Sequence, residues 1–256
     1  MKCTKFKKVL FSVVSAVLCI AMVLSVPASA AGKKSVWSET KALTSAKYNS
    51  NYIKWAEKYS AKEAKNTIAF GKSRTKKFYE SQLEAFNDKD PQFIVNIIDK
   101  ENIVSAAFKD KKTKMVVYTE GSGIAIYVDP KNMTMLSVGD KQKITMPMTE
   151  DIGYDDLIDD MMENFLTFDN DSYMTDELGV TDKTNGKLFK FTSNEKTYYY
   201  EEFEGSKAGK FGFLFNSSGN PLAVVADDMV MCFSVSFSVK DSEFNIPKGY
   251  SDMPLY

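Results

Sequence analysis

The chain has 256 residues, and its 33 basic and 34 acidic side chains leave a formal net charge of −1. It contains no histidine, and Arg74 is its only arginine. This composition argues against histidine-based catalysis, against zinc held by imidazole and thiolate, and against recognition of phosphates or bases by arginine. We expect no cofactor, no metal, no nucleic-acid partner and a monomeric protein.

A secretory signal peptide is predicted over residues 1–30. Four lysines precede an apolar run that ends at Val26, and the tripeptide Ala28-Ser29-Ala30 supplies the small residues that signal peptidase requires. We expect cleavage near Ala30 and a mature protein that is secreted or held in the cell envelope. The alternative is an uncleaved membrane anchor, because the apolar run is long for a signal core.

A polar leader over residues 31–50 precedes a basic helical segment over residues 51–90. Gly71 predicts a break between two helices in that segment. Apolar residues recur there at the spacing of one helix face, first as Tyr52, Trp55, Ala56 and Tyr59, and then as Tyr79, Leu83 and Phe86. Residues 33–90 hold 13 basic and 7 acidic side chains, which indicates either a solvated helix surface or contact with wall polymer or anionic lipid.

From residue 91 the apolar period changes to two, and turn residues separate short runs rich in β-branched and aromatic side chains. These runs predict eleven strands, over 92–99, 102–109, 113–119, 123–129, 132–138, 141–146, 187–193, 196–204, 209–216, 221–226 and 229–239. An amphipathic helix with an acidic outer face is predicted over 149–165. The fold class is therefore mainly β (α+β), with an antiparallel sheet domain over 91–256 and helical segments against its apolar face.

Two neighbouring glutamates, Glu201 and Glu202, stand out on a predicted strand. Adjacent strand residues point to opposite faces, so these carboxylates cannot form the pair that glycoside hydrolysis needs. No other pattern marks a nucleophile or a general base, and we predict that the protein is not an enzyme. Glycoside hydrolysis by two acids that converge only in the fold is the alternative within catalysis.

Two further candidates are a calcium loop and a reactive thiol. Residues 169–171 read Asp-Asn-Asp, but the sixth and twelfth loop positions are Met174 and Val180 instead of glycine and glutamate. We therefore expect no calcium there. Cys232 is the only cysteine after the signal peptide, so no internal disulfide is possible. No base or cation beside it is identifiable, and we expect it to be packed and inert.

The order of elements resembles the lipoprotein-localisation-factor superfamily, the LolA-like and LppX/LprG-like half-barrels, over roughly residues 90–250. The resemblance depends on the strand rhythm, the run Tyr198–Phe203 and the closing motif Phe244-Asn245-Ile246-Pro247-Lys248-Gly249-Tyr250. It implies a strongly curved antiparallel sheet, a half-barrel whose concave face is covered by helices, and no catalytic residues. Characterised members shelter acyl chains between sheet and helices. This chain has no lipobox cysteine, and its lysine-rich, arginine-poor composition is typical of an uncharacterised Gram-positive branch.

We therefore expect a secreted, non-catalytic protein that shelters an apolar, acyl or lipid-like ligand. The eleven methionines of the mature chain suit an adaptable apolar cavity, although ordinary core filling explains them as well. Ligand-lining residues are expected at alternate apolar positions: Met115, Val117, Ile124, Ile126, Met133, Met135, Phe213, Met231, Phe233 and Val235. The alternative is a structural or interaction module of the cell envelope, with a filled core and basic helices that dock on wall polymer or an envelope protein.

Overall fold

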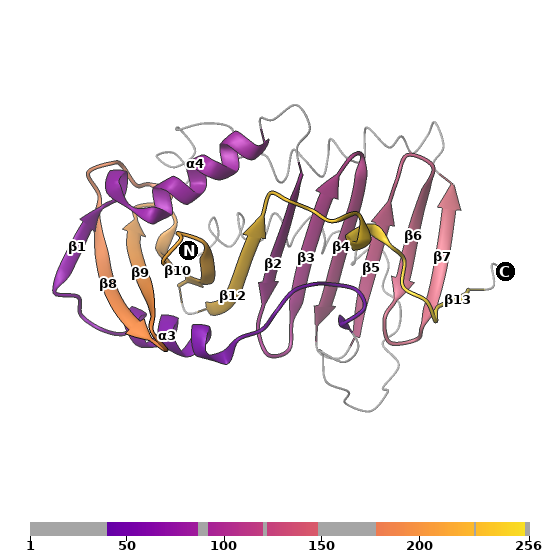
Figure 1. The fold of residues 1–256 in the computed structure, drawn as a ribbon, viewed down its shortest axis with the longest axis horizontal. Coiled ribbons are helices and arrows are strands. Elements are labelled where there is room, and N and C mark those ends of the chain that lie inside the picture. Colours follow the sequence, from indigo (N-terminus) through magenta and orange to yellow (C-terminus); the bar gives the residue numbers. More distant parts are fainter. Residues whose placement is uncertain (1–39, 87–91, 120–121, 148–177, 228, 254–256) are drawn as a thin grey trace. The chain divides into compact units, whose positions relative to one another are not determined.

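The computed structural model describes residues 40–86, 92–119, 122–147, 178–227 and 229–253 (Figure 1). These residues are mainly β, as predicted. They divide into two compact units. The first unit contains residues 48–86, 178–227 and 229–235, and the second contains residues 40–47, 92–119, 122–147 and 236–253. Each unit has its own strands and its own core.

The first unit is a meander of antiparallel strands with two helices. The order across its sheet is β1 (Asn66–Ala69), β8 (Asn185–Ser193), β9 (Lys196–Gly205), β10 (Gly209–Asn216), β11 (Pro221–Ala226) and β12 (Met229–Ser236), and its helices are α3 (Ser50–Ser60) and α4 (Arg74–Phe86). Asn194 and Glu195 connect β8 to β9 with φ angles of 47° and 62°. Positive φ at both positions is what a two-residue hairpin turn requires, so the strands can follow one another closely.

Helices α3 and α4 cover opposite faces of this sheet. α4 packs Phe78 on the face that carries Phe213, whereas α3 packs Ala56 on the face that carries Leu214. Phe213 and Leu214 are adjacent on β10, so their side chains point to opposite sides. Figure 1 shows the two helices on either side of β8–β10. The unit has three layers because β10 and β11 are apolar on both faces, as their unbroken runs of buried residues show.

The second unit is a meander of six antiparallel strands with a short seventh strand at its edge. Its order is β2 (Phe93–Ile98), β3 (Ile103–Lys109), β4 (Lys112–Thr119), β5 (Ser122–Val128), β6 (Asn132–Ser137), β7 (Gln142–Pro147) and β13 (Ser251–Asp252), with β13 parallel to β7. One face of this sheet carries the alternate side chains that we call the methionine face: Thr113, Met115, Val117, Ile124, Ile126, Val128, Met133 and Met135.

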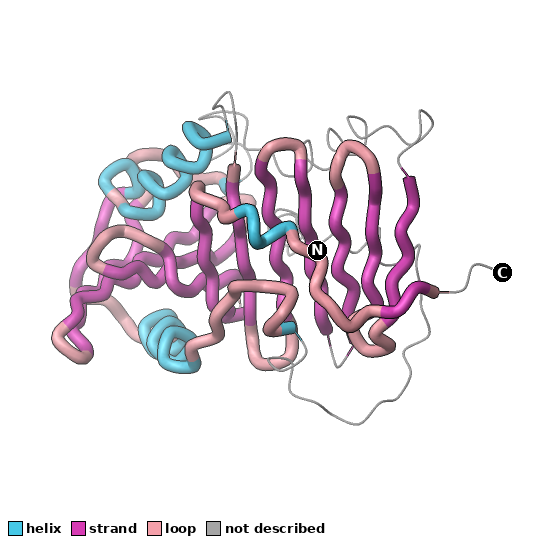
Figure 2. The backbone as a smooth tube through the Cα atoms, turned by 45° about the vertical axis from the view of Figure 1, so that its right-hand side comes forward, coloured by secondary structure: helices cyan, strands magenta, loops and turns pink. Residues whose placement is uncertain are grey.

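The C-terminal segment, residues 239–252, lies on the other face of the second unit. Val239 and Phe244 pack with Ile94 and Ala107. Phe244 is the last residue of the 3-10 helix η3 (Asp241–Phe244). Figure 2 shows the segment crossing in front of the strands before it ends beside β7. The C-terminal segment therefore covers one face of this sheet and pairs with its edge.

The predicted strands are confirmed, and each boundary is within two residues of the prediction except the last, where β12 ends at Ser236 instead of residue 239. The helical segment predicted over 51–90 is interrupted more widely than Gly71 alone indicates, because β1 and the 3-10 helix η1 (Phe70–Lys72) lie between the helices. Gly71 itself approaches Asp182, where an added Cβ would lie 2.9 Å from the aspartate Cβ.

Three predicted segments lie wholly or partly outside the described residues, and the predicted placement of the helices on the sheet needs a correction. The signal peptide, residues 31–39 of the polar leader and the acidic helix over 149–165 lie outside the described residues. The prediction that the helices share one face of the sheet is wrong for α3 and α4, which lie on opposite faces. The reason is that β9–β11 have a second apolar face, which carries Tyr200 and Leu214, and α3 buries this face.

Candidate functional site

The two glutamates of β9 point to opposite faces of the first unit, as strand alternation predicts. Glu201 is 0% exposed and Glu202 is 4% exposed. A buried carboxylate is stable only when other groups donate hydrogen bonds to it or carry a compensating charge.

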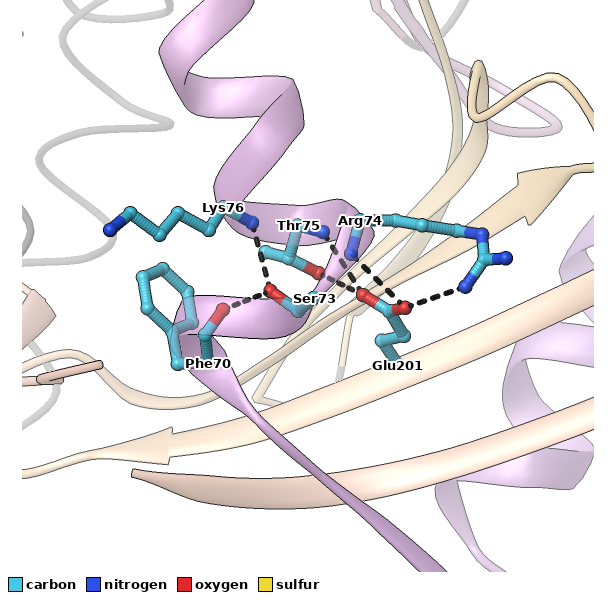
Figure 3. A network of polar contacts seen from close by, with 6 residues as sticks. All are labelled: Phe70, Ser73, Arg74, Thr75, Lys76 and Glu201. Atoms are coloured by element: carbon cyan, nitrogen blue, oxygen red, sulfur yellow. Dashed lines mark hydrogen bonds and ion pairs between the residues drawn. The ribbon is translucent and has the colours of Figure 1, made fainter. Parts of the chain in front are cut away.

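Glu201 binds the first turn of α4 (Figure 3). Its Oε1 accepts hydrogen bonds from the backbone N–H of Arg74 at 3.2 Å and from Arg74 Nη1 at 3.3 Å. Its Oε2 accepts from the backbone N–H and the Oγ1 hydroxyl of Thr75, both at 3.0 Å. The first N–H groups of a helix have no partner within the helix, and a negative charge there is favoured by the helix dipole.

Neighbouring residues complete the start of α4. Ser73 Oγ accepts from the backbone N–H of Lys76 at 2.9 Å and donates to the carbonyl oxygen of Phe70 at 2.7 Å, so Ser73 acts as the N-cap. The guanidinium carbon of Arg74 lies 3.5 Å from the ring centre of Tyr199. The single arginine of the chain is therefore held by a carboxylate and an aromatic ring within its own unit.

Glu202 binds the end of α3 on the opposite face. Its Oε2 accepts hydrogen bonds from Ser60 Oγ and from the Tyr200 hydroxyl, both at 2.6 Å. Its Oε1 lies 2.8 Å from Lys187 Nζ, which also donates to the carbonyl oxygen of Ser60 at 3.0 Å. Burial, with a smaller effect of the nearby carboxylate, raises the pKa of Tyr200 well above its ordinary value, so this hydroxyl stays a donor.

These contacts favour a structural role for both carboxylates over a catalytic one. Each carboxylate already accepts from several donors, and the sheet separates them, so they cannot share the bond of one substrate. The Ser60 hydroxyl donates to a carboxylate, but nothing described beside it stabilises an oxyanion. Glu201 and Glu202 each attach one helix to the sheet, and sequence alternation alone indicates only that they are separated.

The ten predicted lining residues divide between the two units. Six lie on the methionine face of the second unit, where the register places Met115 opposite Ile126 and Ile126 opposite Met135. Met115 is 2% exposed and Ile126 is 5% exposed, whereas the other four are half-buried: Val117, Ile124, Met133 and Met135. Alternation therefore identified a set of residues that share one face across three strands.

The other four predicted lining residues belong to the core cluster of the first unit, into which α4 packs Phe78. The ring of Phe213 lies 5.6 Å from that of Phe78 and 6.0 Å from that of Phe233. Met231 and Val235 pack against the same cluster. In the first unit, the sheet face that carries Phe213 is therefore occupied by aromatic side chains of the protein itself.

A polar group on the methionine face was not identified from the sequence. Thr113 is 4% exposed, and its Oγ1 has no hydrogen-bond partner among the described residues. It lies opposite Val128, which in turn lies opposite Met133. Most buried hydroxyl groups in proteins have a partner, so this one requires an explanation.

An ion pair in the second unit was also missed. Lys114 Nζ lies 2.6 Å from Glu243 Oε2 of the C-terminal segment, with the side chains 1% and 15% exposed. Burial lowers the pKa of Lys114, and the hydrogen bond and charge of Glu243 oppose that change. The only sequence signal is a lysine that alternates with Val116 and Tyr118 on one apolar strand face.

Cys232 is 3% exposed, and its Sγ accepts a hydrogen bond from the backbone N–H of Asn49 at 3.4 Å. The start of the calcium-like loop, residues 169–171, lies outside the described residues. Within the described parts of the chain, no group of three histidine, cysteine, aspartate or glutamate side chains could hold a metal ion. No helix in these parts has the length and apolar character needed to cross a membrane.

Comparison with known proteins finds distant similarity among solved structures. No protein-family model and no curated protein matches the chain. Among solved structures, an uncharacterised conserved protein from Thermus thermophilus has 9% sequence identity and a TM-score of 0.32, over 70% of this chain and 98% of that chain. A similarity of this size supports no conclusion about the fold or the function.

Proposed function

We propose that the protein is a non-catalytic binding protein that shelters an apolar, acyl or lipid-like ligand on the methionine face. The observation that carries the proposal is the set of six predicted lining residues on this face, four of them only half-buried. Each buried methylene group contributes about 0.8 kcal/mol, so an acyl chain needs no charged anchor. Flexible thioether side chains adapt to ligands of different shape.

The proposal includes export and the fold family. The signal-like residues 1–30 support secretion, with a mature chain that begins at Ala31. The antiparallel meander of β2–β7 is compatible with a LolA-like half-barrel, a strongly curved sheet with helices over its concave face. We restrict the ligand site to the second unit, because the four candidate residues of the first unit pack in its core cluster, where Phe78 contacts Phe213 and Phe233.

Native mass spectrometry of the protein exported from a bacterial host tests the binding function. We expect the mature mass together with an adduct in the mass range of a lipid, and displacement of that adduct by an apolar dye. Met135→Lys places a charge on the methionine face and is expected to abolish binding. Met135→Leu is the matched control, because it keeps an apolar side chain of similar volume at the same position. A clean apo mass with no dye binding would refute the proposal.

A filled-core interaction module is the second candidate, and the packed aromatic cluster of the first unit favours it. In this alternative the basic helices dock on wall polymer or an envelope protein. Two cations of α4 have partners within the unit, since Arg74 pairs with Glu201 and Lys76 pairs with Asp182 at 2.8 Å. Docking therefore depends on other lysines, and a cell-wall pull-down that weakens with salt would favour this candidate.

A further inference from the structure

We infer that Thr113 is the polar anchor of the ligand site, and that the ligand is an acyl compound whose carbonyl oxygen accepts a hydrogen bond from the Thr113 hydroxyl. This inference rests on the proposed binding function and specifies the class of ligand. It starts from the buried Oγ1 of Thr113, which has no partner among the described residues. If the face were purely apolar, valine at this position would be more stable, because it has the same shape without a buried hydroxyl that lacks a partner.

The position of Thr113 relates it to the lining residues. It lies on β4 two residues before Met115 and four residues before Val117, so all three share one face. The register places Val128 beside Thr113, and Met133 beside Val128. The hydroxyl is therefore at one end of the apolar row of β4, in the position of a headgroup contact relative to an acyl chain that follows the strand.

The chemistry of the hydroxyl selects the ligand group. A threonine hydroxyl donates one hydrogen bond and accepts others, and a buried hydroxyl without a partner destabilises the protein. The carbonyl oxygen of an ester or an amide accepts one hydrogen bond and needs no counter-charge. An acyl ester therefore satisfies Thr113, whereas a hydrocarbon or an aromatic dye without an acceptor does not.

Thr134 provides an internal comparison. It is also buried, at 3% exposure, but it lies on the other face of the sheet. Its Oγ1 is 3.1 Å from Oγ1 of Thr145, so its hydroxyl has a partner within the protein. The two threonines therefore predict opposite effects of the same substitution to valine.

The test compares two uncharged fluorescent probes, the methyl ester of cis-parinaric acid and the hydrocarbon diphenylhexatriene, in the mature exported protein. For Thr113→Val we expect the affinity for the ester to fall about 10-fold and the affinity for the hydrocarbon dye to stay unchanged. Thr113→Ser keeps the hydroxyl and is expected to retain the affinity for the ester. Thr134→Val is expected to leave both affinities unchanged.

Thermal unfolding without ligand is the second measurement, and it does not depend on binding. Thr113→Val is expected to raise the melting temperature by about 2–4 °C, because it removes a buried hydroxyl without a partner, whereas Thr134→Val is expected to lower it. An unchanged ester affinity or a lower melting temperature in Thr113→Val overturns the inference. Failure of the wild-type protein to bind either probe refutes the proposed function itself, so the two failures are distinguishable.

Discussion

Substitution of Glu243 by glutamine removes the counter-charge of a buried lysine. Lys114 Nζ is 2.6 Å from the carboxylate, and the lysine side chain is 1% exposed. Leaving one charge of such a pair without its partner costs about 3–5 kcal/mol. Because Glu243 belongs to the C-terminal segment, the protein can lower this cost by releasing the segment so that water reaches Lys114. We therefore expect local detachment of the segment before global unfolding.

Hydrogen exchange followed by mass spectrometry measures this detachment. Backbone N–H groups at both ends of the segment donate to the sheet, Val239 to Gln92 Oε1, Ser251 to the carbonyl of Lys141 and Met253 to the carbonyl of Lys143. A loss of about 3 kcal/mol speeds their exchange about 100-fold, since 1.4 kcal/mol corresponds to a factor of ten. Asp241→Asn is the control, because the Lys109–Asp241 pair is exposed and we expect no change.

The pH dependence gives a second, independent test. A lysine with a lowered pKa in the folded state binds fewer protons than in the unfolded state, so stability rises with pH between its folded pKa and the ordinary value of 10.5. In Glu243→Gln that pKa falls further, because Glu243 no longer raises it. The destabilisation is therefore largest near neutral pH and decreases towards pH 9, below the range where Tyr127 ionises. Unchanged exchange at neutral pH, or a destabilisation that grows with pH, would contradict this reasoning.

Three further substitutions test the helix contacts by chemical denaturation. Glu201→Gln is expected to lower the free energy of unfolding by about 2–3 kcal/mol and to speed amide exchange in the first turn of α4, and normal exchange there would contradict its capping role. Tyr200→Phe removes a donor to Glu202 and is expected to cost about 1–3 kcal/mol, whereas a neutral result would mean that the carboxylate does not depend on it. Phe78→Ala opens a cavity beside Phe213 and is expected to cost about 3–5 kcal/mol; a cost below about 1 kcal/mol would mean that α4 does not cover that face.

Much of the strand framework was predictable because its signals are local. Alternation of apolar and polar residues depends only on the two-residue repeat of a strand, and the turn residues mark where each strand ends. The same rule predicted that Glu201 and Glu202 point apart and that Met115 and Val117 share a face. The stripe of α3 was also recognised, since Trp55, Ala56 and Tyr59 recur at helical spacing and pack on the sheet.

Other features depend on partners that are distant in the sequence. The contact of Glu201 with Arg74 spans 127 residues, and that of Lys114 with Glu243 spans 129 residues. The hydroxyl of Thr113 has no distinguishing signal in the sequence, because only the packed neighbourhood decides which buried groups lack a partner.

The sequence by itself determined the strands, their faces and the separation of the two glutamates, since each follows from backbone geometry between near neighbours. The tertiary structure decided which helix covers which face, which charges are paired and which buried hydroxyl has no partner. These depend on how distant segments meet, and the periodicity of one segment carries no information about the identity of the segment that packs against it.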